Sequence, residues 1–132
     1  MSQLHSVLAG IDFSDPSISA LKEAQRISRH DGARFTVLHV IDTEVLVEIT
    51  RQSGVASDDV VAEAKDKLAQ HLATVLGGDH KAEGVVAVGH PFGELRDEAD
   101  RQEADLIVIG SQGFGKTPHR IGAVAARCLR KA

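Results

Sequence analysis

The sequence predicts an α/β protein in which a doubly wound parallel sheet carries helices on both faces. Short apolar runs alternate with longer amphipathic segments along the 132 residues. Each short run is apolar on both of its faces, which is typical of strands in a parallel sheet covered on both sides. The chain contains no repeat, low-complexity segment or linker, so we expect one domain over residues 1–132.

The first expected strand, SVLAGID at 6–12, leads into the first helix. Asp15 is the expected N-cap, and Pro16 suits the first helical position because its missing N–H would be unpaired there anyway. The helix should run to about His30, and Gly32 should close it.

The second expected strand, FTVLHVID at 35–42, is rich in β-branched residues. A polar stretch without a clear period follows at 42–56. The longest helix is expected at about 57–76, with Ser57 or Asp58 as its cap and with apolar residues at helical spacing.

The third expected strand is VVAVG at 85–89. His90 and Pro91 then open a helix of about a dozen residues, in which Leu95 and Ala99 should face inward.

The fourth expected strand is ADLIVIG at 104–110, and a basic, glycine-rich loop follows at 111–118. A last helix is expected from about His119, with Cys128 on its buried face. On that face Cys128 serves packing rather than nucleophilic chemistry.

Composition and charge exclude two classes of partner. The formal net charge of −4 and the pI near 5.9 argue against a nucleic-acid binder, which needs a positive surface. The absence of Tyr and Trp leaves little aromatic surface on which bases could stack. No apolar run approaches the roughly 18 residues of a membrane span, so we expect neither a nucleic-acid partner nor membrane insertion.

The N-terminal residues show no signal-peptide pattern, and the single cysteine cannot form an internal disulfide. Both features suit a reducing compartment, so we expect a cytoplasmic protein.

The segment GSQGFGKT at 110–117 matches the phosphate-binding loop pattern G-x-x-x-x-G-K-[ST] of P-loop NTPases. In that fold, however, the loop usually follows the first strand, whereas here it follows the last. No hydrophobic strand ending in Asp lies downstream, and Pro118 removes an N–H from the helix that should point at the phosphates. A P-loop enzyme therefore ranks third among the functions considered.

A different site accounts for more of the chain. In doubly wound sheets, ligands bind outside the carboxyl ends of the strands, where the strand order reverses. Gly10, Ile11 and Asp12 end the first strand, and Asp12 offers a carboxylate to an adenine amine or a ribose. The segment 110–113 (GSQG) ends the fourth strand, where the backbone can approach phosphate because side chains are missing. Gly122 lies near the start of the expected last helix, whose N-terminus favours an anion.

These segments together resemble the universal stress protein family over essentially the whole chain. The resemblance rests on SVLAGIDFSDPSISALKEA, FTVLHVID, VGHPFGEL and ADLIVIGSQGFGK…IGAVAARCLRKA. It implies a five-stranded sheet in the order 3-2-1-4-5, an ATP site beside strands 1 and 4, and a homodimer. The family signature G-x2-G-x9-G-[ST] begins at Gly110 and Gly113.

The resemblance implies that Asp12 anchors the adenosine and that the backbone of Val40 contacts the adenine. Gly110, Gly113, Gly122 and Lys116 would hold the phosphates, with Mg²⁺ as a possible counter-ion. The full nucleotide site is then Gly10, Ile11, Asp12, Val40, Ile109, Gly110, Gln112, Gly113, Lys116, Gly122, Ala123 and Val124.

The chain departs from the signature in two ways. Eight residues rather than nine separate Gly113 from Gly122, and Ala123 replaces the Ser or Thr. Losing one neutral hydrogen bond costs about 0.5–1.5 kcal/mol, which would weaken but not abolish a micromolar site of about −8 kcal/mol. The sequence also stops at Ala132, before the family's fifth strand, so we expect that strand to be absent and one edge of the fourth strand to be open.

Structural explanations remain open for the same residues. Asp12 suits a cap on the turn into the first helix, and Gly110 and Gly113 suit a tight turn without ligand. Lys116 also suits an ordinary solvated charge, and His39 suits a core histidine. Neither a metal-ligand pattern nor a G-x-S-x-G elbow is present.

Two functions therefore lead. The first is a stress-response regulatory protein that binds ATP with slow or no hydrolysis, so at most a weak ATPase. The second is a family member that binds no nucleotide and acts through contacts with an unidentified protein partner.

Overall fold

A sheet with four parallel strands forms the centre of the computed structural model, which describes residues 3–110 and 119–121. Its strand order is β3-β2-β1-β4-β5, so the expected order 3-2-1-4 of the parallel strands is confirmed. The strands are β1 (Ser6–Ile11), β2 (Arg34–Asp42), β3 (Glu83–Gly89), β4 (Leu106–Gly110) and β5 (His119–Ile121).

The register of the sheet brings the ends of three strands together. Ile11, the last residue of β1, pairs with His39 of β2 on one side and with Gly110 of β4 on the other. Because all three strands run in the same direction, their carboxyl ends meet at one edge of the sheet, on either side of the point where the strand order reverses.

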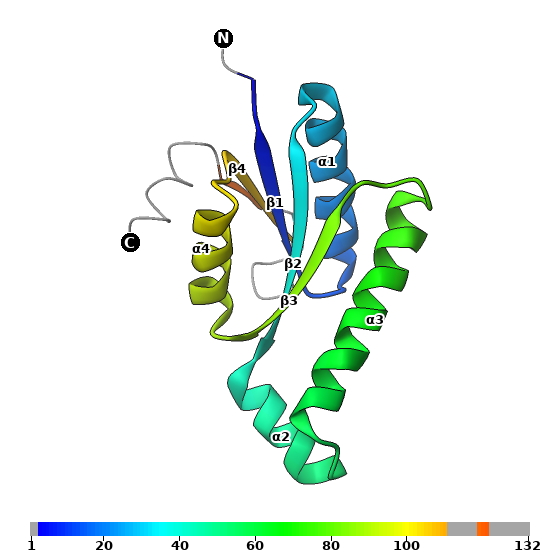
Figure 1. The fold of residues 1–132 in the computed structure, drawn as a ribbon, viewed down its shortest axis with the longest axis vertical. Helices are drawn as coiled ribbons and strands as arrows, with labels where there is room; N and C mark the ends of the chain where they lie inside the picture. The colour runs from blue at the N-terminus through cyan, green and yellow to red at the C-terminus, as the bar shows by residue number, and fades with distance from the viewer. Residues whose placement is uncertain (1–2, 111–118, 122–132) are drawn as a thin grey trace.

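Helices cover both faces of the sheet (Figure 1). The helices α1 (Asp15–Asp31) and α3 (Ser57–Leu76) lie on one face, and α4 (Pro91–Arg101) lies on the other. This arrangement follows from right-handed crossovers: the chain moves outward from β1 to β3 over one face and returns to β4 over the opposite face. The expected α/β fold class is confirmed.

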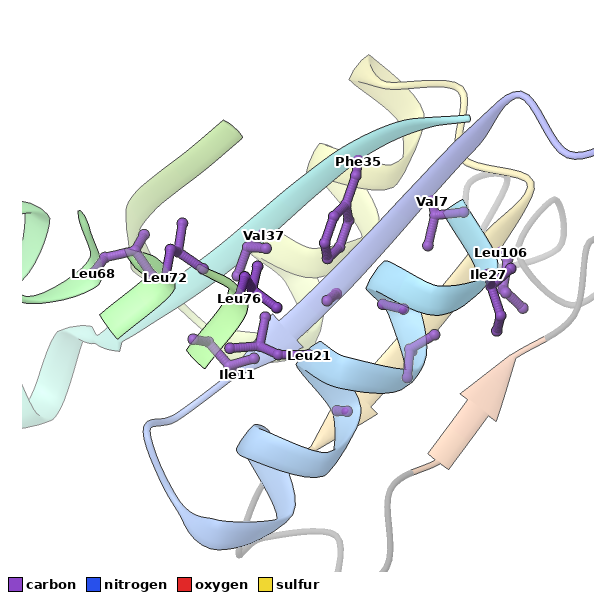
Figure 2. Close-up of a cluster of buried hydrophobic side chains, with 14 residues drawn as sticks. Val7, Ile11, Leu21, Ile27, Phe35, Val37, Leu68, Leu72, Leu76 and Leu106 are labelled. Atoms are coloured by element: carbon purple, nitrogen blue, oxygen red, sulfur yellow. The ribbon is translucent and has the colours of Figure 1, made fainter. Parts of the chain in front are cut away.

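Each face has its own hydrophobic core. On the α1/α3 face, one continuous cluster includes Val7 and Ile11 of β1, Leu21 of α1, and Leu68 and Leu72 of α3 (Figure 2). On the α4 face, Leu95 and Ala99 of α4 pack against the strands. The strand residues of this cluster are Leu8 of β1, Leu38 of β2, and Ile107 and Ile109 of β4. The predicted inward orientation of Leu95 and Ala99 is confirmed.

Two predicted helix caps are wrong by one or two residues. The N-cap of α1 is Ser14 rather than Asp15, which lies in the first helical turn where its negative charge favours the helix dipole. The N-cap of α3 is Ala56 rather than Ser57 or Asp58. The αL conformation of Gly32, with φ of 65°, closes α1 as expected.

The stretch 42–56 contains a helix that the sequence pattern did not predict. Helix α2 (Thr43–Ser53) begins at Asp42, whose side chain accepts the N–H of Glu44 at 2.8 Å, and it ends at Gly54 in the αL conformation. Figure 1 shows α2 beyond the carboxyl edge of the sheet, beside the N-terminal half of α3. Only Leu46 of this helix is buried.

The expected last helix from about His119 is wrong for residues 119–121. These residues form β5, which pairs antiparallel with β4, with Ile121 opposite Ile107 and His119 opposite Ile109. The expected open edge of the fourth strand is therefore covered by a short strand from within the chain. None of the described helices combines the length and the apolar composition that a membrane span needs.

Candidate functional site

A pocket of about 230 Å³ lies at the carboxyl edge of the sheet on the α4 face. Five of the predicted site residues line it: Gly10, Ile11, Asp12, Val40 and Ile109. They come from the ends of β1, β2 and β4, which the sheet register brings together. The topology therefore assembles the strand-derived part of the predicted nucleotide site.

The second wall of this pocket comes from the start of α4. Pro91, Phe92 and Leu95 line it, together with Leu38 of β2. Phe92 is exposed although it is a large aromatic residue. The sequence pattern placed Leu95 inward, but it did not predict this wall, whose signal was the segment His90-Pro91-Phe92 directly after a strand.

Gly10 lies close to the Leu95 side chain of α4. A Cβ atom at Gly10 would lie 3.2 Å from Cδ1 of Leu95. A side chain at this position would therefore be in tight contact with the end of the Leu95 side chain, which would have to shift by a few tenths of an ångström. Glycine at this position thus has a packing reason that is independent of any ligand.

Gly110 does not line the pocket. The lack of a side chain at this position is explained by the close contact with α1. A Cβ atom there would lie 2.3 Å from the carbonyl oxygen of Pro16 and 2.6 Å from Cβ of Ala20. The structure thus supports the structural explanation of Gly110: a tight approach of β4 to the first turn of α1.

Asp12 is held by hydrogen bonds at the start of α1. Its Oδ1 accepts the backbone N–H of Ser14 at 3.0 Å and lies 2.8 Å from the hydroxyl of Ser17. The Ser17 hydroxyl in turn accepts the backbone N–H of Asp12 at 2.8 Å. The capping role left open for Asp12 is therefore present, and the carboxylate is oriented by it.

Ser17 contacts the Asp12 carboxylate, and the sequence pattern did not single it out. It is fully buried, and its hydroxyl reaches both Asp12 Oδ1 and the carbonyl oxygen of Gly110. Ser17 thereby joins the ends of β1 and β4 through one side chain. The motif D-F-S-D-P-S carries the residue, but serine there is equally typical of an ordinary helix start.

On the opposite face, an aromatic cluster supports the segment that follows β1. Phe13 has a positive φ of 67°. The centroid of its ring lies 4.5 Å from the ring centroid of His39 and 5.1 Å from that of His71. Lys67 Nζ lies 4.4 Å from the centre of the Phe13 ring. The positive φ of a bulky residue is costly, so we infer that these contacts hold Phe13 in place.

His39 is hydrogen-bonded as expected, but it is half-buried rather than a residue of the core. Its Nδ1 lies 3.1 Å from the carbonyl oxygen of Ile11, to which an N–H at that atom donates. Burial lowers the pKa of His39, as does the charge of Lys67, although the bond to Ile11 opposes the shift. Burial and Lys67 also lower the pKa of His71. Both imidazoles are therefore neutral near pH 7.

Most of the predicted phosphate-binding half of the site lies outside the described residues. Of the four residues expected to hold the phosphates, only Gly110 is described; the predicted site residues outside the described ranges are Gln112, Gly113, Lys116, Gly122, Ala123 and Val124. The neighbouring residues 119–121 are described, and they form a strand where a P-loop requires the first turn of a helix. This placement argues against the P-loop interpretation of GSQGFGKT.

The chemistry of the described pocket is mainly apolar. Asp12 is the only titratable residue among the described residues that line it. The volume of the pocket is below the range of about 300–1,000 Å³ that is typical of small-molecule sites. The pocket therefore suits one part of a larger ligand. Residues 3–110 and 119–121 contain no group of three or more side chains that could hold a metal ion.

Comparison with known proteins gives the same picture of the fold. In solved structures, the chain is similar to the universal stress protein UspA from Lactobacillus plantarum, with a TM-score of 0.65 and 24% identity, covering 98% of this chain and 91% of that one. It is also similar to a universal stress protein in complex with cAMP, with a TM-score of 0.52 and 25% identity, covering 80% and 71% of the two chains.

The sequence comparisons agree. The chain is 26% identical over 132 residues to the universal stress protein YxiE of Bacillus subtilis, covering 92% of this chain and 88% of the relative. The model of the universal stress protein family matches residues 4–132. The chain therefore belongs to the universal stress protein family.

Proposed function

We propose that this protein is a single-domain regulatory protein of the stress response that binds an adenine nucleotide at the carboxyl edge of its sheet. One observation carries the proposal: Gly10, Ile11, Asp12, Val40 and Ile109 converge on one pocket where the strand order reverses. Ligands of doubly wound sheets bind at this place.

The pocket walls suit the adenosine part of the ligand. Leu38, Leu95 and Ile109 offer apolar surface to a base, and Phe92 adds an aromatic ring. The carboxylate of Asp12 is fixed at the rim and accepts hydrogen bonds from hydroxyl or amine groups. A similar structure of this family is a complex with cAMP, which supports an adenine nucleotide as the ligand class.

ATP is the nucleotide we propose, with Mg²⁺ as its counter-ion. Gly113, Lys116 and Gly122 would hold its phosphates beyond the pocket described above. Any hydrolysis should be slow, because Asp12 is the only titratable group among the described lining residues and already serves as a hydrogen-bond acceptor in the turn. A base that activates water must be within hydrogen-bond reach of that water.

The test is a calorimetric titration of the purified, nucleotide-stripped protein with Mg-ATP, AMP and cAMP. We expect micromolar binding, equivalent to about −8 kcal/mol. Equal affinity for the three ligands would place the recognition in the adenosine pocket alone, whereas a preference for ATP would support a phosphate site. Absence of heat and of thermal stabilisation at millimolar nucleotide would overturn the proposal.

The second candidate is a protein that acts through partners without nucleotide. Exposed aliphatic side chains on α2 favour it, because such side chains mark contact surfaces when they gather in one place. We further propose, on the family resemblance, a cytoplasmic homodimer. Sedimentation at several protein concentrations tests the dimer, and a change of mass on adding Mg-ATP would link it to the nucleotide site.

A further inference from the structure

A second hollow lies beside the nucleotide pocket, on the α3 face of the sheet. It has a volume of about 650 Å³ and runs between α2 and α3; we call it the α2–α3 groove. Its walls include Val45 and Ile49 of α2, Val60 and Glu63 of α3, Asp12 directly after β1, and Asp42 at the end of β2.

Several large apolar side chains that line this groove are exposed to solvent. Val45 is 52% exposed, and Ile49 and Val55 are each 40% exposed, yet all three line the groove. Val45 and Ile49 are four residues apart on α2, so their side chains lie on one face of the helix. Contiguous exposed apolar side chains of this kind mark interaction sites.

The position of α2 leaves this surface open. The helix lies beyond the edge of the sheet (Figure 1), and it buries only Leu46. Val60 and Ala64 of α3 form the opposite wall, one helical turn apart. Two helices with apolar facing sides leave a trough that suits an amphipathic helix or an extended aliphatic segment.

The charges around the groove are mainly negative. Asp12, Asp42 and Glu63 line it, and Lys67 is the single permanent cation among the described lining residues. The ammonium of Lys67 lies over the Phe13 ring, and His39 is neutral near pH 7 because burial lowers its pKa. The groove thus offers an aliphatic floor with an acidic rim.

We propose that the α2–α3 groove binds a segment of a partner protein that combines an aliphatic ridge with flanking lysine or arginine side chains. The aliphatic ridge would cover Val45, Ile49 and Val60, and the basic side chains would face Asp42 and Glu63. Charge complementarity selects this occupant. The same acidic rim would repel an anionic membrane surface.

The experiment uses a fluorescein-labelled amphipathic peptide of leucine and lysine, about four helical turns long. A peptide of the same pattern with glutamate in place of lysine is its counterpart. Binding is followed by fluorescence anisotropy with the full chain. We expect the lysine peptide to bind, with an affinity that falls as salt is added, and the glutamate peptide not to bind.

Helix α2 offers a matched pair of variants. Val47 is 54% exposed, slightly more than Val45, but it does not line the groove. We expect Val45→Asp to weaken the affinity for the lysine peptide at least about tenfold. Val47→Asp should change that affinity less than about twofold. In the same way, Glu63→Lys should weaken binding and Glu48→Lys, which lies outside the groove, should not.

Either of two results would overturn the proposal. The first is equal loss of binding in Val45→Asp and Val47→Asp, which would mean general hydrophobic adhesion. The second is no binding of the lysine peptide up to millimolar concentration. Circular dichroism of each variant shows whether it is folded, and Ile49→Ser is a milder second change in the groove. The measurements use nucleotide-free protein, so neither outcome depends on whether the protein binds nucleotide.

Discussion

Gly110 at the end of β4 rests against the backbone of Pro16 at the start of α1. The carbonyl oxygen of Pro16 lies 2.3 Å from the position that a Cβ atom at Gly110 would occupy. The glycine is thus required by the packing of two elements before any ligand is considered. A glycine in a nucleotide-binding pattern can therefore reflect the fold as well as the ligand.

We predict that Gly110→Ala destabilises the protein, because the new methyl group must displace backbone rather than a flexible side chain. Overpacking of this kind typically costs about 1–3 kcal/mol. The free energy of unfolding in urea measures it. Gly78→Ala is the control, since a Cβ atom there meets nothing within 4 Å. Equal stability of the two variants would show that β4 can move away from α1 at little cost.

Ser17→Ala should loosen the carboxyl edge of the sheet. The change removes a fully buried hydroxyl that contacts Asp12 and Gly110, and it leaves the N–H of Asp12 without that acceptor. We expect a loss of about 1–3 kcal/mol in unfolding free energy. We also expect weaker nucleotide binding, because the Asp12 carboxylate loses a contact that orients it.

Ser28→Ala is the matched control for that experiment. Ser28 is also buried on α1, but its hydroxyl donates within the helix to the carbonyl of Gln25. It should affect stability without affecting nucleotide affinity. If both serine variants bind Mg-ATP as the wild type does, Ser17 has no role in positioning Asp12 for the ligand.

The fold was predictable from the sequence because its signal is repeated along the chain. The strands ending at Ile11, Asp42, Gly89 and Gly110 are each a short, nearly continuous apolar run between amphipathic segments. Helix α2 was not predictable in this way. Its apolar residues Val45, Leu46, Val47 and Ile49 fall within five positions of an 11-residue helix, which is too short a span to show a helical period, and only Leu46 is buried.

The candidate site was predictable only where it depends on topology. Asp12 and Val40 follow from the rule that ligands bind at the carboxyl ends of strands. The wall formed by Phe92 depends on how α4 packs against the sheet, and the link through Ser17 depends on a contact across 93 residues of sequence. Neither has a local pattern that distinguishes it from an ordinary helix start.

Acid should destabilise the folded protein through two histidines. Burial and Lys67 lower the folded-state pKa of His39 and His71 below the ordinary value of 6.5. The unfolded chain therefore binds protons first, and stability that is fully present above about pH 6.5 falls as the pH decreases from there through the folded-state pKa values. Urea unfolding at several pH values between about 8 and 5 measures how steeply the free energy of unfolding depends on pH.

His71→Leu should flatten this dependence. The Nε2 atom of His71 is buried and has no hydrogen-bond partner among the described residues. Leucine keeps an apolar contact with Phe13 and removes both the titration and the unpaired polar atom. An unchanged pH slope in His71→Leu, together with an unchanged slope in His39→Gln, would show that other groups cause the acid sensitivity.

Phe92→Ala should weaken adenine nucleotide binding without loss of stability. The side chain is exposed, but it lines the pocket at the start of α4. If the base stacks on it, the loss should resemble that of other base–aromatic contacts, about 1–3 kcal/mol. Calorimetric titration measures the affinity. Val88→Ala, also exposed but outside the pocket, is the control, and equal affinities in the two variants would exclude a role for the ring.

Nucleotide and groove peptide should influence each other, because Asp12 and Val40 line both the pocket and the α2–α3 groove. A ligand that holds Asp12 changes the acidic rim available to the peptide, so saturating Mg-ATP should change the peptide's dissociation constant. Linkage requires the same factor for the effect of the peptide on nucleotide affinity. Anisotropy titrations with and without Mg-ATP, paired with calorimetry with and without peptide, measure both factors. Equal dissociation constants in all conditions would show that the two sites act independently.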